Sequence, residues 1–287
     1  MNYRHAFHAG NFADVFKHVL LRELVHAMQR KPKPFLFLDT HAGRGRYDLA
    51  QAEAGGRAPE WPDGIGRLWD APGLPAPLAD LVAAVHEYNR RCGAEPGTLR
   101  YYPGSPVFAQ LLARPDDRLA LCELQPDEAA ALDRESVYAR KARVYPVDGY
   151  GAPRAMLPPL ERRALVLIDP PFEATDEMSR VAAAVEEALA RSPAAVVAVW
   201  YPLSERVATA PLFRLLRERR LAPTLIAEFR VRADSAEAGL GGCGMAMINP
   251  PWQFDIAMRP VLSQLARLLA HDDGANCKLD WLVAESR

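Results

Sequence analysis

The sequence predicts an α/β fold with a mostly parallel, doubly wound sheet of seven strands. Short apolar runs alternate with amphipathic helical segments, which is the pattern of a parallel sheet covered by helices. Several of these runs end at an acidic residue. The interval between the first two runs is longer than one crossover needs, which indicates an insertion. The 287 residues suffice for one large α/β domain with an insertion, or for two small domains.

The first elements are a helix over residues 12–29 and a strand over 35–38. Asn11 is a suitable N-cap for the helix, and Asp14 lies in its first turn, near the positive end of the helix dipole. The strand is an apolar run that ends at Asp39, before a glycine-containing turn. We therefore expect Asp39 at the carboxyl edge of the sheet.

Further strands and helices alternate along the rest of the chain. The predicted strands lie at 119–124, 142–150, 165–168, 194–202, 224–231 and 245–251, and the helices between them at 107–114, 126–136 and 178–191. The link between the last two strands contains no helical pattern, which indicates that the final strand turns back antiparallel. A C-terminal helix over 253–270 is expected to kink at Pro260, and 277–284 is a candidate edge strand.

The insertion is expected over residues 47–100. This stretch is rich in proline and glycine and contains one clear helical piece, at 77–91. We expect an inserted, mostly helical subdomain there. The chain is thereby divided into 1–46, 47–100 and 101–287. The main fold resumes at YYPGSP, where Ser105 is expected to cap the next helix with Pro106 at its first position.

Composition and charge place the chain among ordinary globular proteins. Hydrophobic residues make up 49% and charged residues 25%, and the net charge of −1 is not that of a generally nucleic-acid-binding protein. The N-terminus lacks the apolar run of a signal peptide, and no stretch approaches transmembrane length. The scattered cysteines argue against a zinc ribbon or a disulfide framework. They are Cys92, Cys122, Cys243 and Cys277. A cytoplasmic protein with reduced thiols is the simplest interpretation.

Basic residues form local clusters despite the neutral total. The clusters lie at Arg30, Lys31 and Lys33, at Arg44 and Arg46, at Arg162 and Arg163, and at 214–220. Any one cluster is usually a solvated face, whereas several on one side would form a phosphate-binding surface.

The segment LVLIDPPFE carries the clearest chemical pattern. Two prolines follow the buried strand and end its hydrogen bonding, because neither has an N–H group. Asp169 and Pro170 are then held extended, so that the carboxylate and the Pro170 carbonyl can face the same space. These are two acceptors with no nearby donor in the sequence, and they fit a donor-rich group such as an exocyclic amine. A simple strand stop with a helix cap is the alternative.

Acidic residues at the other strand ends suggest a cofactor site. The chain has GRG instead of the dinucleotide-binding GxGxxG pattern. Glu123, after the second strand, suits a ribose diol, because a carboxylate can accept both hydroxyl hydrogens. Asp148-Gly149, after the third strand, suits an adenine amine. The order of these acids suggests S-adenosylmethionine in a class I methyltransferase fold of the Rossmann-like type.

A family resemblance is carried by YRHAFHAGNFADVFKH, LDTHAGRGRY, YYPGSP, CELQP, DGY, LIDPPF and INPPW. Together these segments resemble the bacterial RlmJ family of 23S ribosomal RNA adenine-N6 methyltransferases over essentially the whole chain. The resemblance implies a class I fold with an inserted helical subdomain, S-adenosylmethionine as the cofactor and S-adenosylhomocysteine as the product. It implies a 23S ribosomal RNA substrate, protein-free or at an early stage of assembly, and neither a membrane nor an obligate protein partner.

The resemblance also assigns roles to individual residues. The residues implied to contact the cofactor are His18, His41, Ser105, Glu123, Asp148 and Gly149. Asp169 is implied to be catalytic, and Tyr3 is implied to touch the RNA. Phe172 departs from the family motif, which usually has tyrosine there. Ring stacking survives that change, but the hydrogen bond of a phenol does not.

The residue chemistry is compatible with these roles. The N6 of adenine is a poor nucleophile because its lone pair is delocalised into the ring. Hydrogen bonds to Asp169 and to the Pro170 carbonyl would localise that pair, and Asp169 could then accept a proton. Phe172 could stack on the unpaired base. This chemistry needs no metal. Imidazoles at His18 and His41 are expected near the cofactor carboxylate, with Lys17 as a charged neighbour.

Several alternatives stay open. INPPW, with Asn249, is a second candidate for the same chemistry, although an antiparallel last strand would point it away from the cofactor. His5, His8 and His18 could offer three nitrogens to a metal, but no closely spaced cysteine or acid completes the set. The other function classes are a DNA adenine-N6 methyltransferase and a non-catalytic RNA-binding relative.

Overall fold

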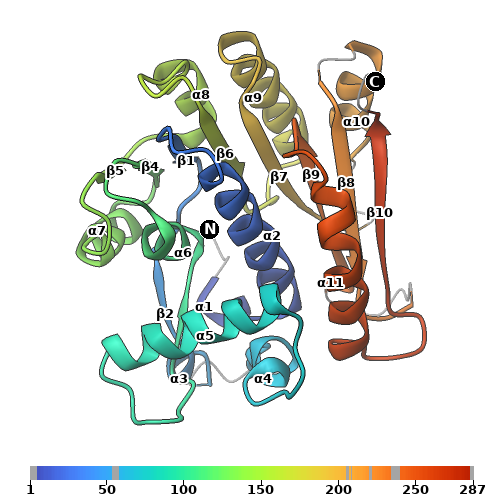
Figure 1. The fold of residues 1–287 in the computed structure, drawn as a ribbon. Coiled ribbons are helices and arrows are strands. Elements are labelled where there is room, and N and C mark those ends of the chain that lie inside the picture. Colours follow the sequence, from blue (N-terminus) through green and yellow to red (C-terminus); the bar gives the residue numbers. More distant parts are fainter. Residues whose placement is uncertain are drawn as a thin grey trace.

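The computed structural model describes residues 5–53, 58–204, 207, 209–219, 222–233 and 240–284. Within them, the main sheet has eight strands in the order β10-β8-β9-β7-β6-β1-β4-β5 (Figure 1). The strands are β1 (Leu36–Asp39), β4 (Arg118–Cys122), β5 (Ala142–Tyr145), β6 (Ala164–Ile168), β7 (Val196–Pro202), β8 (Thr224–Arg230), β9 (Gly242–Ile248) and β10 (Asn276–Val283).

Strand directions confirm the predicted topology. β1 pairs in parallel with β4 and β6, and the parallel pairing continues to β5 on one side and β7 on the other. β9 runs antiparallel to both β7 and β8, as the helix-free link predicts. This arrangement is that of the class I S-adenosylmethionine-dependent methyltransferase fold. The expected count of seven strands is one short, because β10 adds an antiparallel edge strand beside β8.

Helices cover both faces of the sheet. They are α2 (Phe12–Gln29), α6 (Ser105–Leu112), α7 (Pro126–Glu135), α8 (Ala152–Met156), α9 (Glu177–Arg191), α10 (Ala210–Arg219) and α11 (Phe254–Leu268), whereas the short helix α1 (His5–His8) precedes α2. Residues of α2, α6 and α11 belong to the core on one face, and residues of α8, α9 and α10 to the core on the other. All five residues of β6 are buried between these cores, as expected for a strand covered on both sides.

Helix α2 begins where the sequence predicts. The Asn11 side chain caps it by accepting hydrogen bonds from the backbone N–H groups of Ala13 and Asp14. Helix α6 begins differently. Gly104 is its N-cap, and Ser105 is already its first residue. The prediction that Ser105 is a cap is therefore wrong, because its hydroxyl donates a hydrogen bond to the buried carboxylate of Asp39 instead.

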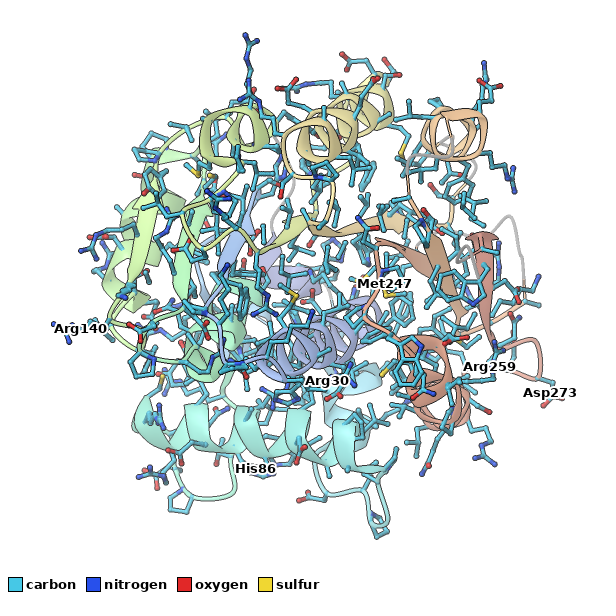
Figure 2. The ribbon with its side chains drawn as sticks, turned by 45° about the horizontal axis from the view of Figure 1, so that its top comes forward. Arg30, His86, Arg140, Met247, Arg259 and Asp273 are labelled. Atoms are coloured by element: carbon cyan, nitrogen blue, oxygen red, sulfur yellow. The ribbon has the colours of Figure 1, made fainter. Side chains whose placement is uncertain are left out.

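Residues 47–100 are mostly helical and lie against α2. They contain α3 (Leu49–Glu53), the 3-10 helix η1 (Trp61–Asp63), α4 (Ile65–Leu68) and α5 (Ala76–Arg91). An antiparallel ribbon of β2 (Arg46–Asp48) and β3 (Tyr101–Pro103) joins the two ends of this segment. Figure 2 shows α2 between α5, marked by His86, and the sheet, marked by Met247. Leu78, Leu81 and Val85 of α5 share a core with α2, so α2 is buried from both sides.

Candidate functional site

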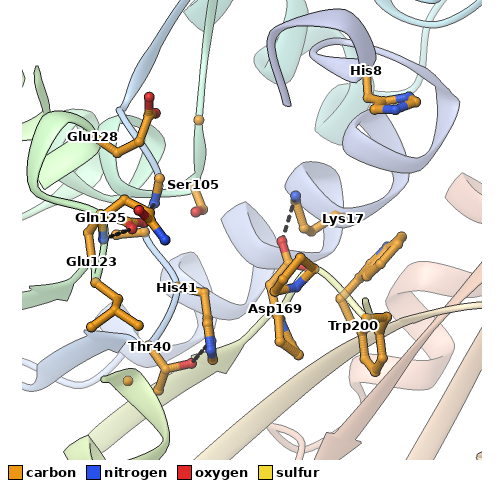
Figure 3. A pocket seen from close by; sticks show the side chains of 18 of the residues that line it. His8, Lys17, Thr40, His41, Ser105, Glu123, Gln125, Glu128, Asp169 and Trp200 are labelled. Carbon is orange, nitrogen blue, oxygen red and sulfur yellow. Dashed lines mark hydrogen bonds and ion pairs between the residues drawn. The ribbon is translucent and has the colours of Figure 1, made fainter. Parts of the chain in front are cut away.

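A cavity of about 840 Å³ opens at the carboxyl ends of the parallel strands. It lies where the strand order reverses, between β1, which is followed by β4 and β5 on one side, and β6, which is followed by β7 on the other. Every predicted site residue that the structure describes lines it. These are His18, His41, Ser105, Glu123, Asp148, Gly149, Asp169, Pro170 and Phe172. Figure 3 shows Glu123 and Ser105 on one side of the cavity and Lys17, Asp169 and Trp200 on the other. Tyr3, predicted to touch RNA, lies outside the described residues.

Asp39 lies behind the cavity wall at the end of β1 and is fully buried. Its carboxylate accepts hydrogen bonds from the Ser105 hydroxyl at 2.7 Å and from the backbone N–H of His41 at 3.3 Å. Burial raises the pKa of Asp39 to about 7, although both hydrogen bonds oppose the shift. Asp39 thus orients Ser105 and the turn after β1.

His41 presents a defined imidazole tautomer to the cavity. The hydroxyl of Thr40 donates its single proton to the carbonyl of Leu167, at 3.0 Å. Oγ1 of Thr40 must then accept from Nδ1 of His41, which lies 2.8 Å away. Burial lowers the pKa of His41 to about 4, so the ring is neutral at neutral pH. Its Nε2 is therefore left as a hydrogen-bond acceptor.

Glu123 is fixed by backbone groups on both oxygens. Oε2 accepts from the N–H of Gly43 at 2.9 Å, and Oε1 accepts from the N–H of Gln125 at 2.7 Å. Burial raises the pKa of this carboxyl, and these two hydrogen bonds lower it in part. A carboxylate has about four acceptor directions, so Glu123 can still accept two hydroxyl hydrogens.

Asp148 and Gly149 form a tight turn after β5, at the start of the 3-10 helix η2 (Gly149–Gly151). Asp148 Oδ1 accepts from the N–H of Tyr150 at 3.0 Å, and Oδ2 binds the Arg180 guanidinium at 2.8 Å. A Cβ atom on Gly149 would stand 1.6 Å from the carbonyl oxygen of Thr40. The turn and the end of β1 therefore approach so closely that position 149 must be glycine.

Asp169, at the end of β6, is paired with Lys17 of α2. The Nζ atom of Lys17 lies 2.8 Å from Asp169 Oδ2 and 2.8 Å from Asp14 Oδ1. The expectation of two acceptors with no nearby donor is therefore wrong, because α2 brings a cation that the local sequence does not contain. Burial alone lowers the pKa of Lys17, but Asp14 and Asp169 raise it well above its usual value. The ammonium is therefore charged at neutral pH.

Aromatic rings form the wall beside Asp169. Phe172 has a left-handed backbone, with φ of 52°, and its ring centroid lies 6.0 Å from that of Trp200. Trp200, near the end of β7, lines the cavity. No role was predicted for Trp200, which falls within the strand predicted at 194–202. Its place directly after a buried apolar run was the signal that could have identified it.

Asn249 lies at the opposite edge of the sheet. It follows β9, which is antiparallel, and its side chain donates hydrogen bonds to the carbonyls of Pro193 and Ala195 at 2.8 and 3.0 Å. Those residues precede β7, so they are at the amino ends of the parallel strands. The Asn-Pro-Pro motif is thus held away from the cavity by the direction of its strand.

The described part of the chain lacks two kinds of feature. No group of three or more histidine, cysteine or acidic side chains in it is placed to hold a metal ion. None of its helices has the length and apolar character required to cross a membrane.

Comparison with known proteins gives concordant matches. The family model described as "Ribosomal RNA large subunit methyltransferase D, RlmJ" matches residues 32–283. Two proteins called ribosomal RNA large subunit methyltransferase J align with 99% of this chain over their whole lengths, at 39% identity for Escherichia coli and 38% for Haemophilus influenzae. A solved structure of a protein from Legionella pneumophila matches with a TM-score of 0.86 and 34% identity, covering 95% of this chain and 98% of its own.

Proposed function

The chain belongs to the RlmJ family of ribosomal RNA large subunit methyltransferases, and we propose that it methylates the exocyclic N6 of an adenosine in 23S ribosomal RNA. The observation that carries this proposal is the pair of acceptors at the end of β6. The Asp169 carboxylate and Pro170 line the same cavity as Glu123 and Asp148, the acids that follow β4 and β5. One cavity can therefore receive an amine beside a methyl donor.

The residues of the β1, β4 and β5 ends fit S-adenosylmethionine. Glu123 would bind the ribose hydroxyls, and Asp148 with the Gly149 backbone would bind the adenine. His41 Nε2, as an acceptor, suits the ammonium of the methionine part and not its carboxylate, near which this imidazole was expected. His18 and Ser105 line the same region. The volume of the cavity lies in the range of small-molecule sites. When bound, the cofactor supplies an electrophilic methyl group on sulfur.

The residues of the β6 and β7 ends are suited to hold the target base. Lys17 already donates a hydrogen bond to Oδ2 of Asp169, so Oδ1 and the Pro170 carbonyl would accept the two hydrogens of the amine. Phe172 and Trp200 would contact the faces of a base that has left its helix. Phe172 does this without the hydroxyl of the usual tyrosine. Positioning of the amine against the methyl donor is the main source of acceleration.

Proton transfer falls to Asp169. The Lys17 ammonium lies 2.8 Å from its Oδ2, which leaves Oδ1 to accept from the amine while the amine nitrogen would gain positive character. After methylation, Asp169 would take up the proton that the nitrogen loses and pass it to solvent. Lys17 thus assists the chemistry by holding the Asp169 carboxylate in place.

The proposal also includes one RNA contact beyond the target base and a division of the chain into domains. Tyr3, in the segment that precedes α1, would touch the RNA, and 47–100 would act as the inserted subdomain of a methyltransferase domain formed by 1–46 and 101–287. Protein-free 23S ribosomal RNA is the proposed substrate form.

Tritium transfer from labelled S-adenosylmethionine tests the function. Purified protein is incubated with protein-free 23S ribosomal RNA, with 16S ribosomal RNA or with duplex DNA, and the product nucleosides are identified by mass spectrometry. We expect N6-methyladenosine in the 23S RNA, and a loss of labelling of about 100-fold or more for Asp169→Ala. Labelling of duplex DNA alone would point to a DNA methyltransferase. Binding of 23S RNA without labelling would point to a non-catalytic relative.

A further inference from the structure

Glu60 connects the inserted segment to the start of α2. Its Oε2 atom lies 2.9 Å from Nδ1 of His8 and accepts a hydrogen bond from Nδ2 of Asn11 at 2.8 Å. Glu60 and His8 are 38% and 36% exposed, whereas Asn11 is buried. One carboxylate oxygen therefore holds two side chains from the chain segment that leads into the helix.

The same two segments also meet through their backbones. The N–H of Ile65 donates to the carbonyl of Gly10 at 2.8 Å. A Cβ atom on Gly64 would lie 2.1 Å from that carbonyl oxygen, so the backbones are in direct contact. Residues 60–65 and 8–11 thus form one packed unit, in which Glu60 supplies the side-chain contacts.

Hydrogen bonds continue from this unit to the proposed catalytic carboxylate. Asn11 accepts from the backbone of Asp14, and Asp14 accepts from the N–H of Gly10 through Oδ2. Asp14 Oδ1 then binds Lys17, and Lys17 binds Asp169. Asn11, Asp14 and Lys17 are each 5% exposed, so little water is available to replace a lost contact. A displacement of Asn11 would be transmitted to the ammonium that holds Asp169.

We propose that Glu60 is a positioning residue for methyl transfer: by holding Asn11 and His8, it sets the Lys17–Asp169 pair and couples the inserted segment to the active site. The inference rests on the proposed function, because it takes Asp169 as the group that receives the target amine. His8 lines the cavity beside this chain of contacts, so Glu60 also fixes one part of the wall that RNA would meet (Figure 3).

Substitution of Glu60 tests this role. Glu60→Ala removes the acceptor for both neighbours, whereas Glu60→Gln keeps one carbonyl oxygen that can accept from Asn11 and His8. A matched control is Glu23→Ala, which removes a second Glu–His pair on α2, with 3.1 Å between Glu23 Oε1 and His26 Nδ1. The readouts are kcat and KM with 23S ribosomal RNA, and the dissociation constant of S-adenosylmethionine by calorimetry.

We expect Glu60→Ala to lower kcat by tenfold or more while the cofactor dissociation constant changes less than twofold, which also shows that the variant is folded. Glu60→Gln should keep at least half of the wild-type kcat, and Glu23→Ala should match the wild type. The inference is overturned if Glu60→Ala retains full kcat. It is also overturned if Glu60→Ala lowers kcat and weakens cofactor binding together, and Glu60→Gln does not restore kcat. If the wild-type protein itself does not methylate ribosomal RNA, the proposed function fails instead.

Discussion

Nζ of Lys17 lies 2.8 Å from Oδ2 of Asp169, although 152 residues separate them in the chain. The contact joins the first turn and a half of α2 to the end of a central strand. The Lys17 ammonium also binds Asp14 at 2.8 Å, so the carboxylates of Asp14 and Asp169 share one cation in a nearly water-free environment. Lys17 therefore determines the charge that the target amine would meet.

We expect Lys17→Met to lower the rate of methylation by about 100-fold at neutral pH. Without the ammonium, the Asp14 and Asp169 carboxyls face each other, and one of them takes up a proton. Part of the rate should return as the pH is raised, because the carboxyls then ionise despite their repulsion. Single-turnover methylation of 23S RNA between pH 6 and pH 9 measures both effects.

The control for this variant is Lys31→Met, which changes an exposed lysine in the loop after α2. It should follow the wild-type pH profile. A Lys17→Met protein that methylates at the wild-type rate would show that Asp169 needs no counter-ion.

Asn249→Ala should leave methylation largely intact and lower the free energy of unfolding by about 2–3 kcal/mol. The side chain holds the carbonyls of Pro193 and Ala195, and its φ of 52° is unfavourable for alanine. Urea unfolding checks the stability, and RNA labelling checks the activity. Asn249→Gly separates the two causes, since it relieves the backbone strain but not the lost hydrogen bonds. A loss of labelling in a stable Asn249 variant would mean that the antiparallel motif takes part in the chemistry.

Local patterns in the sequence predicted most of this architecture. Asn11 as the N-cap of α2, the buried β6 and the antiparallel β9 each follow from a few neighbouring residues and their physical preferences. The strand-end residues Glu123 and Asp148 could also be placed together, because parallel strands bring their carboxyl ends to one edge. The parallel topology thus brings residues from separate motifs to the wall of one cavity.

Contacts between distant segments could not be predicted in the same way. Ser105 has the sequence context of a helix cap, but its hydroxyl binds Asp39, 66 residues earlier in the chain. The Lys17–Asp169 pair and the position of Trp200 depend likewise on how α2 and β7 pack around the cavity. Such contacts are set by tertiary packing and leave no periodic signal in the sequence.

Gly149→Ala should abolish measurable binding of S-adenosylmethionine or unfold the protein. The added methyl group would stand 1.6 Å from the Thr40 carbonyl oxygen, so either the turn or the end of β1 must move. Gly151→Ala is a matched control two residues further on, where a Cβ atom meets nothing within 4 Å. Calorimetric titration and thermal unfolding of both variants measure the difference. Wild-type cofactor affinity in Gly149→Ala would contradict the placement of the adenine at this turn.

Glu123→Ala should weaken cofactor binding by about 1.5–3 kcal/mol, the range for hydrogen bonds to a charged group. The carboxylate is oriented by the N–H groups of Gly43 and Gln125, so its remaining acceptor directions are fixed toward the cavity. Glu128→Ala is the control, since Glu128 lines the cavity but forms an ion pair with Arg44, at 3.6 Å. An affinity unchanged by Glu123→Ala, measured by calorimetry, would remove it as the ribose ligand.

Asp39→Asn should alter the pH dependence of stability. The pKa of Asp39 is raised by burial to about 7 in the folded protein, above the ordinary value near 4 expected when unfolded. Between these values the folded state holds a proton that the unfolded state has lost, so this group's contribution to the free energy of unfolding falls as the pH rises. The slope is about 1.4 kcal/mol per pH unit, and the contribution is lost once the pH passes 7.

His41 acts in the opposite direction, because its pKa is lowered to about 4 and the unfolded imidazole binds a proton first. Its contribution to stability therefore grows as the pH rises from about 4 to the ordinary histidine value near 6.5. The wild-type profile alone would mix the two groups, whereas the difference between Asp39→Asn and the wild type isolates Asp39. In urea unfolding, that difference should shift in favour of the variant from pH 5 to pH 7 and level off above. A difference that stays constant with pH would show that Asp39 is ionised throughout, and that the Ser105 and His41 hydrogen bonds outweigh its burial.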